Sequence, residues 1–364
     1  MTIKEFCEHF NISGKYVRCS EVPTGNINCT YKVEYVNEGE NKYYILQKIN
    51  KSVFTEPERV MENIVRVTHH VRMNVIKKGL STKRFVLRAF LSKETGLPFV
   101  VDDHDEYWRC YRFIKDAITY DTCDDLAIIE RAGMAFGRFQ DCLEGFDAAS
   151  LYVSIPDFHN TPKRFATLHK AVEENVCNRV RKVQLELEEL YKIEERACKL
   201  QKLLEDGKIP LRVTHNDTKC NNVSFDKNNG EALAVLDLDT VMPGAVAYDF
   251  GDAIRFIANT RIEDDPDVDA VKLDLEKYEA FTRGFITQIK DNLTDYEKNT
   301  MNLGVLAMTA ELAVRFLTDY LNGDKYFKTK YPGHNLDRAR NQLALTLDII
   351  KKESEIDKIL QKYI

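Results

Sequence analysis

The sequence lacks the features that mark several common classes of protein. Its nine cysteines are scattered and include no C-x-x-C pair, which is typical of reduced thiols in a cytosolic protein rather than of a disulfide framework. No apolar run approaches the roughly 20 residues that span a bilayer, and the N-terminus has no apolar signal-peptide core. We therefore expect a cytoplasmic protein that makes no use of a membrane.

An excess of basic charge is also missing. The formal net charge of −6 is mild and acidic, and it provides no basic patch on which nucleic acid would bind. Apolar and charged residues occur in the proportions of an ordinary globular protein, and 364 residues are enough for two domains with separate cores. The composition predicts two globular domains and no nucleic-acid partner, and it does not determine the oligomeric state.

Most of the residues that indicate chemistry lie in one stretch, residues 211–244. Two apolar runs, 222–225 and 232–238, flank a loop rich in Asn and Gly, which predicts a β-hairpin. With this loop at the centre, Asn222 and Asp237 fall opposite each other, and facing positions on antiparallel strands lie about 5 Å apart. Both side chains carry hard oxygen donors, so the pattern predicts one Mg²⁺ held by Asn222 and Asp237.

His215 and Asp217 precede this hairpin, directly after a β-like run. The order His-x-Asp-x-x-x-x-Asn, with Asp237 following an apolar strand, is typical of enzymes that transfer phosphoryl groups. In that arrangement Asp217 orients the attacking hydroxyl and takes its proton, His215 holds the loop, and Lys219 reaches the γ-phosphate of ATP. A lone His-x-Asp is often a turn cap, whereas the full set with the hairpin is much harder to reach by chance.

An Asp-Phe-Gly tripeptide that begins at Asp249 imitates a metal-binding motif. It lies some thirty residues after Asp217, whereas Asp237 has the spacing of a kinase metal ligand and follows a strand. We expect Asp249 instead to open a helix and to brace the catalytic loop through hydrogen bonds.

The first part of the chain predicts an antiparallel sheet. Strands are expected at 30–36 and 42–49, and a turn around Gly25 and Asn26 precedes them. This turn is suited to folding over phosphates, although it has one glycine where the loop of a protein kinase has three. An ordinary hairpin turn is the alternative interpretation.

Lys48 lies inside the second of these strands. A lysine in a strand is usually an exposed edge residue, but a kinase presents one lysine from this strand to the α- and β-phosphates. A helix that begins near Pro57 carries Glu58 and Glu62, and we expect Glu62 to pair with Lys48. Further strands are predicted at 83–92, 97–101 and 106–114. We place the domain boundary near Ile114, which gives a nucleotide-binding domain over 1–114 and a catalytic, substrate-binding domain over 115–364.

The second domain is predicted to be mainly helical. Gly133, Ala135 and Gly137 on one helix indicate close packing against a neighbour. On a strongly apolar helix, Glu311 and Arg315 share a face at i, i+4, and such charges must be paired or line a cavity. The sequence leaves two interpretations open: a buried ion pair, or an Arg315 that binds substrate. The expected helices cover 124–142, 177–206, 273–320 and 336–361.

Three motifs resemble the aminoglycoside phosphotransferase and choline kinase superfamily, and within it the bacterial N-acetylhexosamine 1-kinases. They are HNDTKCNN at 215–222, LDLDTVMPG at 236–244 and YDFGD at 248–252. The likeness covers most of the chain, with supporting stretches at 25–31, 53–57, 61–64, 107–114 and 315–327.

The resemblance implies an α+β, bilobal protein-kinase-like fold, with an N-terminal antiparallel sheet plus helix and a larger, mainly helical C-terminal lobe. It implies transfer of the γ-phosphoryl group of ATP, with Mg²⁺, to the anomeric hydroxyl of N-acetylglucosamine or N-acetylgalactosamine. The nucleotide-binding residues would be Gly25, Asn26, Thr30, Lys48 and Glu62, and the sugar-binding residues would be Asp217 and Arg315.

Residue chemistry by itself stops at a kinase of a small hydroxyl substrate. The missing glycine triplet and the missing Ala-Pro-Glu segment argue against a protein kinase. No dense anionic or aromatic cation site is evident, which argues against an aminoglycoside, choline or ethanolamine kinase. A catalytically inactive nucleotide-binding regulator is the other class, and the presence of the four key polar residues argues against it.

Overall fold

The computed structural model describes residues 1–23 and 27–364, so the predicted phosphate turn at Gly25 and Asn26 lies outside the described residues. The chain forms two compact units, and each is assembled from separate segments of the sequence. Unit 1 comprises Met1–Ile118, Gly145–Ile155 and Ser224–Met242, and unit 2 comprises Thr119–Glu144, Pro156–Val223 and Pro243–Ile364.

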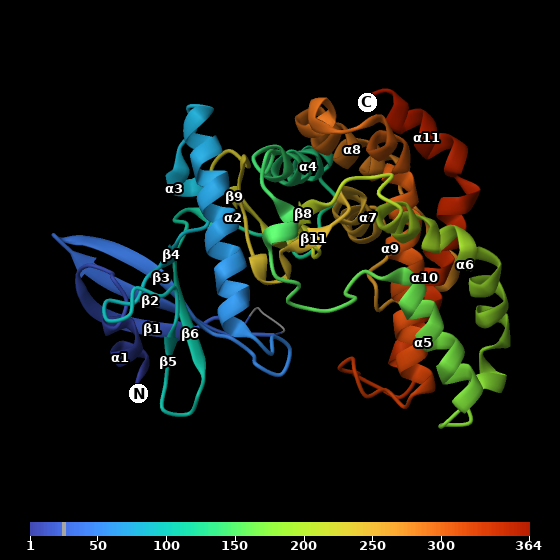
Figure 1. Ribbon diagram of the computed structural model, residues 1–364, viewed down its shortest axis with the longest axis horizontal. Helices are drawn as coiled ribbons and strands as arrows, with labels where there is room; N and C mark the ends of the chain where they lie inside the picture. The colour runs from blue at the N-terminus through green and yellow to red at the C-terminus, as the bar shows by residue number, and fades with distance from the viewer. Residues whose placement is uncertain (24–26) are drawn as a thin grey trace. The chain divides into compact units, whose positions relative to one another are not determined.

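An antiparallel sheet forms the centre of unit 1 (Figure 1). Its order among the described residues is β1-β2-β3-β6-β4, with β5 also paired to β6. The two longest strands pair in continuous register from Cys29 opposite Lys48 to Asn37 opposite Glu40. The strands are β1 (Lys15–Glu21), β2 (Cys29–Asn37), β3 (Glu40–Lys48), β4 (Ala89–Phe90), β5 (Val100–Val101) and β6 (Tyr107–Arg112).

Two helices pack on this sheet, and each of them carries an apolar stripe at helical spacing. The short helix α1 (Ile3–Glu8) buries Phe6, whose ring stacks on Trp108 with centroids 4.1 Å apart. The long helix α2 (Pro57–Lys77) begins with proline at its first turn, where the missing N–H costs little, and buries Met61.

One strand prediction in unit 1 is wrong. Residues 83–92 do not form a continuous strand, because Thr82–Phe85 form the helical turn α3 and the strand of this range, β4, covers Ala89–Phe90 alone. The side chain of Ser81 accepts a hydrogen bond from the N–H of Lys83, so it caps α3 and starts a helix where the apolar pattern indicated a strand.

The predicted hairpin is present but shorter than expected. Strands β9 (Val223–Asp226) and β10 (Ala232–Val235) are joined by the Asn- and Gly-rich loop, and β9 also pairs with β7 (Ala117–Ile118). Asn222 lies before β9 in a 3₁₀ turn, and Asp237 follows β10 with a left-handed φ of 53°. The prediction that Asn222 and Asp237 face each other as strand residues is therefore wrong, because a left-handed residue cannot continue a strand.

Unit 2 is organised around the long helix α9 (Asp295–Leu321), against which α5, α6, α7 and α10 pack (Figure 1). A small sheet joins β8 (Arg212–Thr214) to β11 (Met242–Gly244). The other helices are α4 (Leu126–Asp141), α5 (Thr161–Glu174), α6 (Gln184–Glu205), α7 (Val246–Ile257), α8 (Leu275–Ile289), α10 (His334–Lys351) and α11 (Glu353–Gln361).

Glycines let two pairs of these helices approach closely. A Cβ atom on Gly133 of α4 would lie 2.4 Å from the Phe281 carbonyl oxygen of α8, and one on Gly284 would lie 2.0 Å from the Glu130 carbonyl oxygen. Gly251 of α7 meets α9 in the same way. The close packing predicted from the small residues of α4 is confirmed.

Two helix expectations need correction. The helix predicted over 177–206 begins only at Gln184, because Asn175 and Asn178 adopt positive φ and separate α5 from α6. The sequence was also expected to hold no segment long and apolar enough to span a bilayer. By length and composition α9 is such a segment among the described residues, and 83% of its most apolar window is buried inside the protein, as in a core helix.

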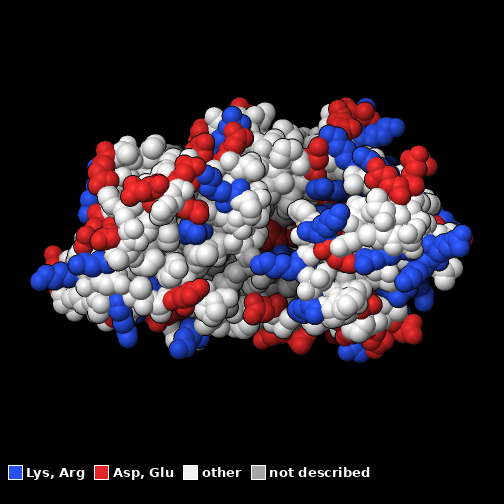
Figure 2. Space-filling model, turned by 90° about the horizontal axis from the view of Figure 1, so that it is seen from below, with Lys and Arg blue, Asp and Glu red and all other residues white. Residues whose placement is uncertain are grey.

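The predicted α+β architecture is confirmed, with an antiparallel sheet in the N-terminal part and a mostly helical C-terminal part. On the face seen in Figure 2, acidic and basic side chains are interspersed, in keeping with the mild net charge.

Candidate functional site

The loop that follows β8 contains His215, Asp217, Lys219 and Asn222 within unit 2. Two side-chain contacts converge on Asp217: Lys219 Nζ lies 2.8 Å from Oδ1, and Asn222 Nδ2 donates to Oδ2 at 3.0 Å. The same Nδ2 atom donates to the Asp217 carbonyl oxygen at 2.8 Å. The loop therefore gathers a half-buried carboxylate, an ammonium group and an amide, as the motif predicted.

His215 is fully buried and holds the loop from inside. Its Nδ1 atom accepts the N–H of Asp217 at 3.2 Å, and the rings of Phe136 and Phe139 on α4 lie edge-on to it. Because Nδ1 is the acceptor, the ring is fixed in one orientation against the apolar face of α4. This geometry suits a structural imidazole.

Asp249, in the first turn of α7, braces the start of the loop. Its carboxylate accepts the backbone N–H groups of His215 at 2.9 Å and Asn216 at 2.8 Å, and Gln140 donates to it at 2.7 Å. Burial raises the pKa of the Asp249 carboxyl, against the opposing effect of His215 and these donors. The expected brace is confirmed, and the Asp-Phe-Gly tripeptide has a supporting role in the loop.

Asp252 continues this support one turn later. Its carboxylate accepts the N–H of Thr218 at 2.9 Å and forms a buried ion pair with Arg255 at 2.8 Å. Burial alone would raise the pKa of Asp252, but the Arg255 guanidinium outweighs it and keeps this pKa below its ordinary value. The loop around Asp217 is thus held by two ionic or polar anchors on one helix.

Lys219 stays protonated in this setting. Burial alone would lower its pKa, but the Asp217 and Asp252 carboxylates outweigh burial and raise it. A permanently charged ammonium group therefore lies beside the Asp217 carboxylate, where a transferring phosphoryl group needs positive charge.

The donor chemistry of Asn222 and Asp237 fits a hard cation. The Nδ2 atom of Asn222 is used on Asp217, which leaves the amide oxygen as the atom for a metal ion. Among the described residues no three His, Cys, Asp or Glu side chains gather into a metal cluster. Each of the two side chains offers a hard oxygen donor, and a kinase metal needs few protein ligands besides phosphates and water.

A buried ion pair that the sequence reasoning missed supports the segment after Asp237. Arg109 on β6 makes a bidentate contact with Asp239, and Asn28 donates to the same carboxylate at 2.7 Å. Burial alone would lower the pKa of Arg109, but Asp239 outweighs burial and raises it. The available signal was an arginine inside a strand that is apolar on both faces. The Asp239 carboxylate is thereby engaged by both Arg109 and Asn28.

Asn63 of α2 fixes the other end of that segment. Its Nδ2 atom donates to the Val241 carbonyl oxygen at 3.1 Å and to the Tyr152 carbonyl oxygen at 2.8 Å. The backbone that follows Asp237 is therefore tied to β6 and to α2, both within unit 1.

The predicted pairing of Lys48 with Glu62 is not formed among the described residues. Lys48 Nζ lies 3.4 Å from Glu106, and Glu62 lies 4.0 Å from Arg66. The reason is the orientation of α2, which buries the face containing Met61 and leaves Glu62 half exposed. The hydroxyl of Thr30, predicted to contact nucleotide, accepts a cross-strand bond from Gln47 at 3.0 Å.

Arg315 lies in a cationic and aromatic cluster of unit 2. Its guanidinium is 3.9 Å from Glu311 and packs over the rings of Phe158 and Phe327, at 5.5 and 5.6 Å from their centroids. Arg164 lies nearby, and its Nε atom is buried with no hydrogen-bond partner among the described residues. Burial and the neighbouring Arg315 lower the pKa of Arg164. The cluster holds two guanidinium groups, and the carboxylates of Glu311 and Asp157 both act electrostatically on Arg164.

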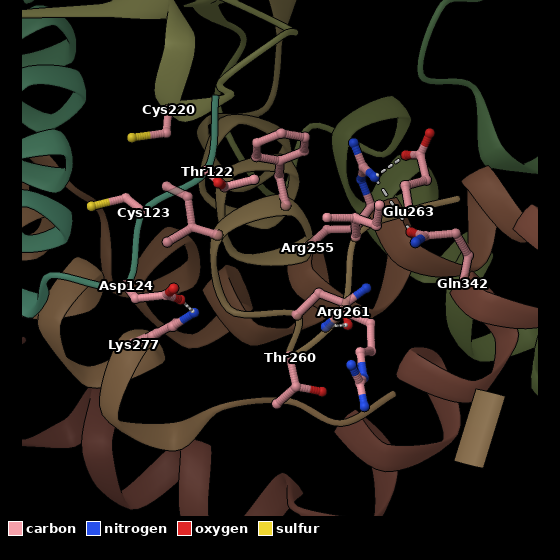
Figure 3. A pocket seen from close by; sticks show the side chains of 14 residues that line it. Thr122, Cys123, Asp124, Cys220, Arg255, Thr260, Arg261, Glu263, Lys277 and Gln342 are labelled. Carbon is pink, nitrogen blue, oxygen red and sulfur yellow. Dashed lines mark hydrogen bonds and ion pairs between the residues drawn. The ribbon is translucent and has the colours of Figure 1, made fainter. Parts of the chain in front are cut away.

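A cavity of about 250 Å³ lies elsewhere in unit 2, between the end of α7 and the start of α4 (Figure 3). Its charged groups are paired: Arg255 contacts Glu263 at 2.7 Å and Lys277 contacts Asp124 at 2.5 Å within the cavity walls, and Arg261 contacts Asp265 and Asp267 outside them. We attribute these charges to holding α7 and α8 in place.

Comparisons with known proteins bear on the family and the fold of the chain. A family model described as the phosphotransferase enzyme family (APH) matches residues 18–285. Similar solved structures include a microcompartment-associated aminopropanol kinase, at 14% identity, 97% coverage of both chains and a TM-score of 0.60. A spectinomycin phosphotransferase in complex with ADP and spectinomycin is 13% identical, with 97% of both chains covered and a TM-score of 0.58. A choline kinase from Cryptosporidium parvum is 14% identical, with 98% of this chain and 96% of that chain covered and a TM-score of 0.55. At such identities the likeness shows a shared fold.

Proposed function

The chain belongs to the phosphotransferase enzyme family, and from that premise we propose that it is an ATP-dependent kinase of a small hydroxyl substrate. We propose further that the acceptor is the anomeric hydroxyl of an N-acetylhexosamine, which gives a sugar 1-phosphate. The observation that supports the activity most directly is the loop in which Asp217 is contacted by both Lys219 and Asn222.

In this proposal Asp217 positions the acceptor. Its carboxylate accepts a hydrogen bond from the hydroxyl, aims the oxygen at the γ-phosphorus and takes the proton as the new bond forms. A loose transition state asks little of the base, so most of the contribution is positioning. An anomeric hydroxyl is more acidic than an ordinary alcohol, which suits a carboxylate of modest basicity.

The nucleotide and metal ligands keep their predicted places in the proposal. Lys48 contacts the α- and β-phosphates, and Lys219 contacts the γ-phosphate beside Asp217. Asn222 and Asp237 are the proposed Mg²⁺ ligands on the chemistry of their donors, and bound Mg²⁺ would neutralise charge on the β- and γ-phosphates. Unit 1 would bind the nucleotide and unit 2 the acceptor.

The charge of the Arg315 cluster supports an uncharged, oxygen-rich acceptor. Arg164 and Arg315 are close enough to affect each other electrostatically, and the buried Nε of Arg164 has no acceptor in the part of the chain that the structure describes. A cationic amine such as choline, ethanolamine or an aminoglycoside would be repelled there, whereas sugar hydroxyls and an acetamido oxygen would accept these donors. This is the reason for preferring a sugar over the amine substrates.

The test is a panel of acceptors with Mg-ATP. We expect acceptor-dependent ADP release with N-acetylglucosamine or N-acetylgalactosamine and none above background with choline, ethanolamine or an aminoglycoside. Asp217→Asn should lower kcat by about a thousandfold or more while retaining the fold, because catalysis loses a group that acts on the reacting hydroxyl. Turnover of an amine instead of a sugar would keep the kinase and overturn the sugar assignment, and no turnover of any acceptor would overturn both.

A further inference from the structure

His159 connects the buried carboxylate of Glu311 to the catalytic loop. Its Nδ1 atom lies 3.0 Å from Glu311 Oε1, and its Nε2 atom lies 3.2 Å from the Asn216 carbonyl oxygen, one residue before Asp217. The imidazole is buried and Glu311 is fully buried, so water does not compete for either contact. All of these residues belong to unit 2.

With Glu311 ionised, the count of donors and acceptors around this imidazole calls for a proton on each ring nitrogen. A carboxylate and a carbonyl group both accept only, so each ring nitrogen must carry a proton to make its contact. A neutral imidazole has one N–H and would leave one contact as a repulsion between lone pairs. Glu311 also accepts from the Thr161 hydroxyl at 3.0 Å. Burial acts to raise the pKa of Glu311, but His159 outweighs burial and keeps it low, in agreement with an ionised carboxylate.

The surroundings of His159 come from three helices. Glu311 of α9 contacts the ring directly, and Thr161 at the start of α5 donates to the same carboxyl group. On α7 the ring of Tyr248 has its centroid 5.6 Å away, and the charge of Asp252 interacts with His159 without a hydrogen bond between them. Glu311 is therefore the one carboxylate that is hydrogen-bonded to the ring among the described residues.

The carbonyl group that His159 binds belongs to a strained residue. Asn216 has a left-handed φ of 64°, a conformation that a residue other than glycine adopts at a cost. Its N–H is held by Asp249 at 2.8 Å, and its carbonyl oxygen by His159. The N–H and the carbonyl group of this residue are thus both held, and its backbone conformation determines how the next residue, Asp217, is oriented.

We propose that His159, protonated on both ring nitrogens and held by Glu311, is a positioning residue that orients Asp217 through the Asn216 carbonyl group. The proposal rests on the proposed kinase activity for its kinetic consequence. It assigns to the His159–Glu311 pair a role in the alignment of the acceptor hydroxyl and none in proton transfer.

A pair of conservative variants separates this role from simple packing. In His159→Gln the terminal amide takes the place of Nε2 and still donates to the Asn216 carbonyl group. In His159→Asn the amide takes the place of Nδ1, so it still donates to Glu311 but no longer reaches the loop. We expect the Gln variant to stay within about threefold of the parent kcat and the Asn variant to lose about 10- to 100-fold. The KM for ATP should be unchanged in both.

The matched control is His169→Asn. His169 is an exposed histidine of the same unit that contacts a glutamate, Glu194, at 2.9 Å and does not touch the loop. It should leave kcat unchanged. Equal kcat values for His159→Gln and His159→Asn, with similar melting temperatures, would show that the hydrogen bond to the Asn216 carbonyl group does not set the rate, and would overturn the proposal.

A second readout does not depend on activity. In protein labelled with ¹⁵N-histidine, both ring nitrogens of His159 should give the shifts of protonated nitrogen at neutral pH, and the His159→Asn spectrum identifies the signals. A bare ring nitrogen would overturn the proposal even in an active enzyme. Two protonated nitrogens in a protein that phosphorylates nothing would support the contacts of His159 with Glu311 and the Asn216 carbonyl group, and would contradict the proposed function.

Discussion

At the scale of single residues, buried charges in this protein hold backbone segments rather than react. Arg109 and Asp239 form such a pair in unit 1, and Asp252 with Arg255 forms another in unit 2. Each pair fixes a segment next to a residue that the motif marks as functional. Because a buried charge without its partner is costly, removing one member of a pair should lower the free energy of unfolding more than it affects catalysis.

Asp239→Asn should lower the free energy of unfolding by about 3 kcal/mol, because it leaves the Arg109 guanidinium buried without a counter-charge. Urea denaturation monitored by circular dichroism measures this loss. Asp105→Asn is the control, since Asp105 is an exposed partner of Lys51 in the same unit and should change little. A double variant, Arg109→Met with Asp239→Leu, should recover most of the loss. Equal stability of Asp239→Asn and the parent would contradict the importance of the pair.

Asp264 gives unit 2 a predictable dependence on pH. Its carboxylate is bound by Lys330 at 2.7 Å and Arg338 at 2.6 Å, and these contacts outweigh burial and lower its pKa from 3.8 to about 2. A lowered pKa stabilises the fold above the unfolded value and loses that effect as pH falls through the folded value. Asp264→Asn should therefore cost about 2 kcal/mol at pH 7.

The cost of Asp264→Asn should shrink to about half by pH 3, because Asp264 in the unfolded parent chain is then mostly protonated while the folded carboxylate is still mostly ionised, so protonation favours the unfolded state. Chemical denaturation of the parent and the variant at pH 7, 5, 4 and 3 tests this. Asp269→Asn, an exposed acid of the neighbouring turn, is the control. A difference in stability that stays constant across this range would show that the carboxylate charge is not what stabilises the fold.

At the scale of elements, apolar periodicity predicted the strands and helices well. Features that depend on the backbone angles of a single residue were not predicted. The strands β2 and β3, the helix α2 and the glycine-rich face of α4 follow directly from apolar spacing. The left-handed φ of Asp237 and the cap formed by Ser81 each depend on one residue's backbone angles, and no period signals them. The hairpin was therefore predicted with the right loop and with strands that were too long.

The contact between α4 and α8 offers a direct test at this scale. Gly284→Ala would place a Cβ atom 2.0 Å from the Glu130 carbonyl oxygen, and a backbone atom cannot move aside as a flexible side chain can. We expect a loss of about 1–3 kcal/mol or more, from forced separation of the two helices. Differential scanning calorimetry measures it. Glu276→Ala, on an exposed position of α8, should leave the melting temperature nearly unchanged, and an unchanged Gly284→Ala would contradict the packing.

At the scale of the whole molecule, the chain returns to unit 1 twice after leaving it. Gly145–Ile155 and Ser224–Met242 belong to unit 1 although both lie far beyond the first segment, which ends at Ile118. The sequence predicted a single domain boundary near Ile114. It could not show that a unit is built from separate segments, because that depends on long-range contacts such as that of Arg109 with Asp239. The catalytic loop was predictable because its residues are contiguous, whereas His159 and Glu311 are brought to it from distant segments.

We propose that this phosphotransferase places phosphate on an anomeric hydroxyl. The most direct measurement is ³¹P NMR of the product formed from Mg-ATP and N-acetylglucosamine or N-acetylgalactosamine, with Asp217→Asn as the inactive comparison. We predict a new phosphomonoester signal coupled to the anomeric proton, present with the parent and absent with the variant. Phosphate coupled to the protons of carbon 6, or a product that forms equally with Asp217→Asn, would contradict the account.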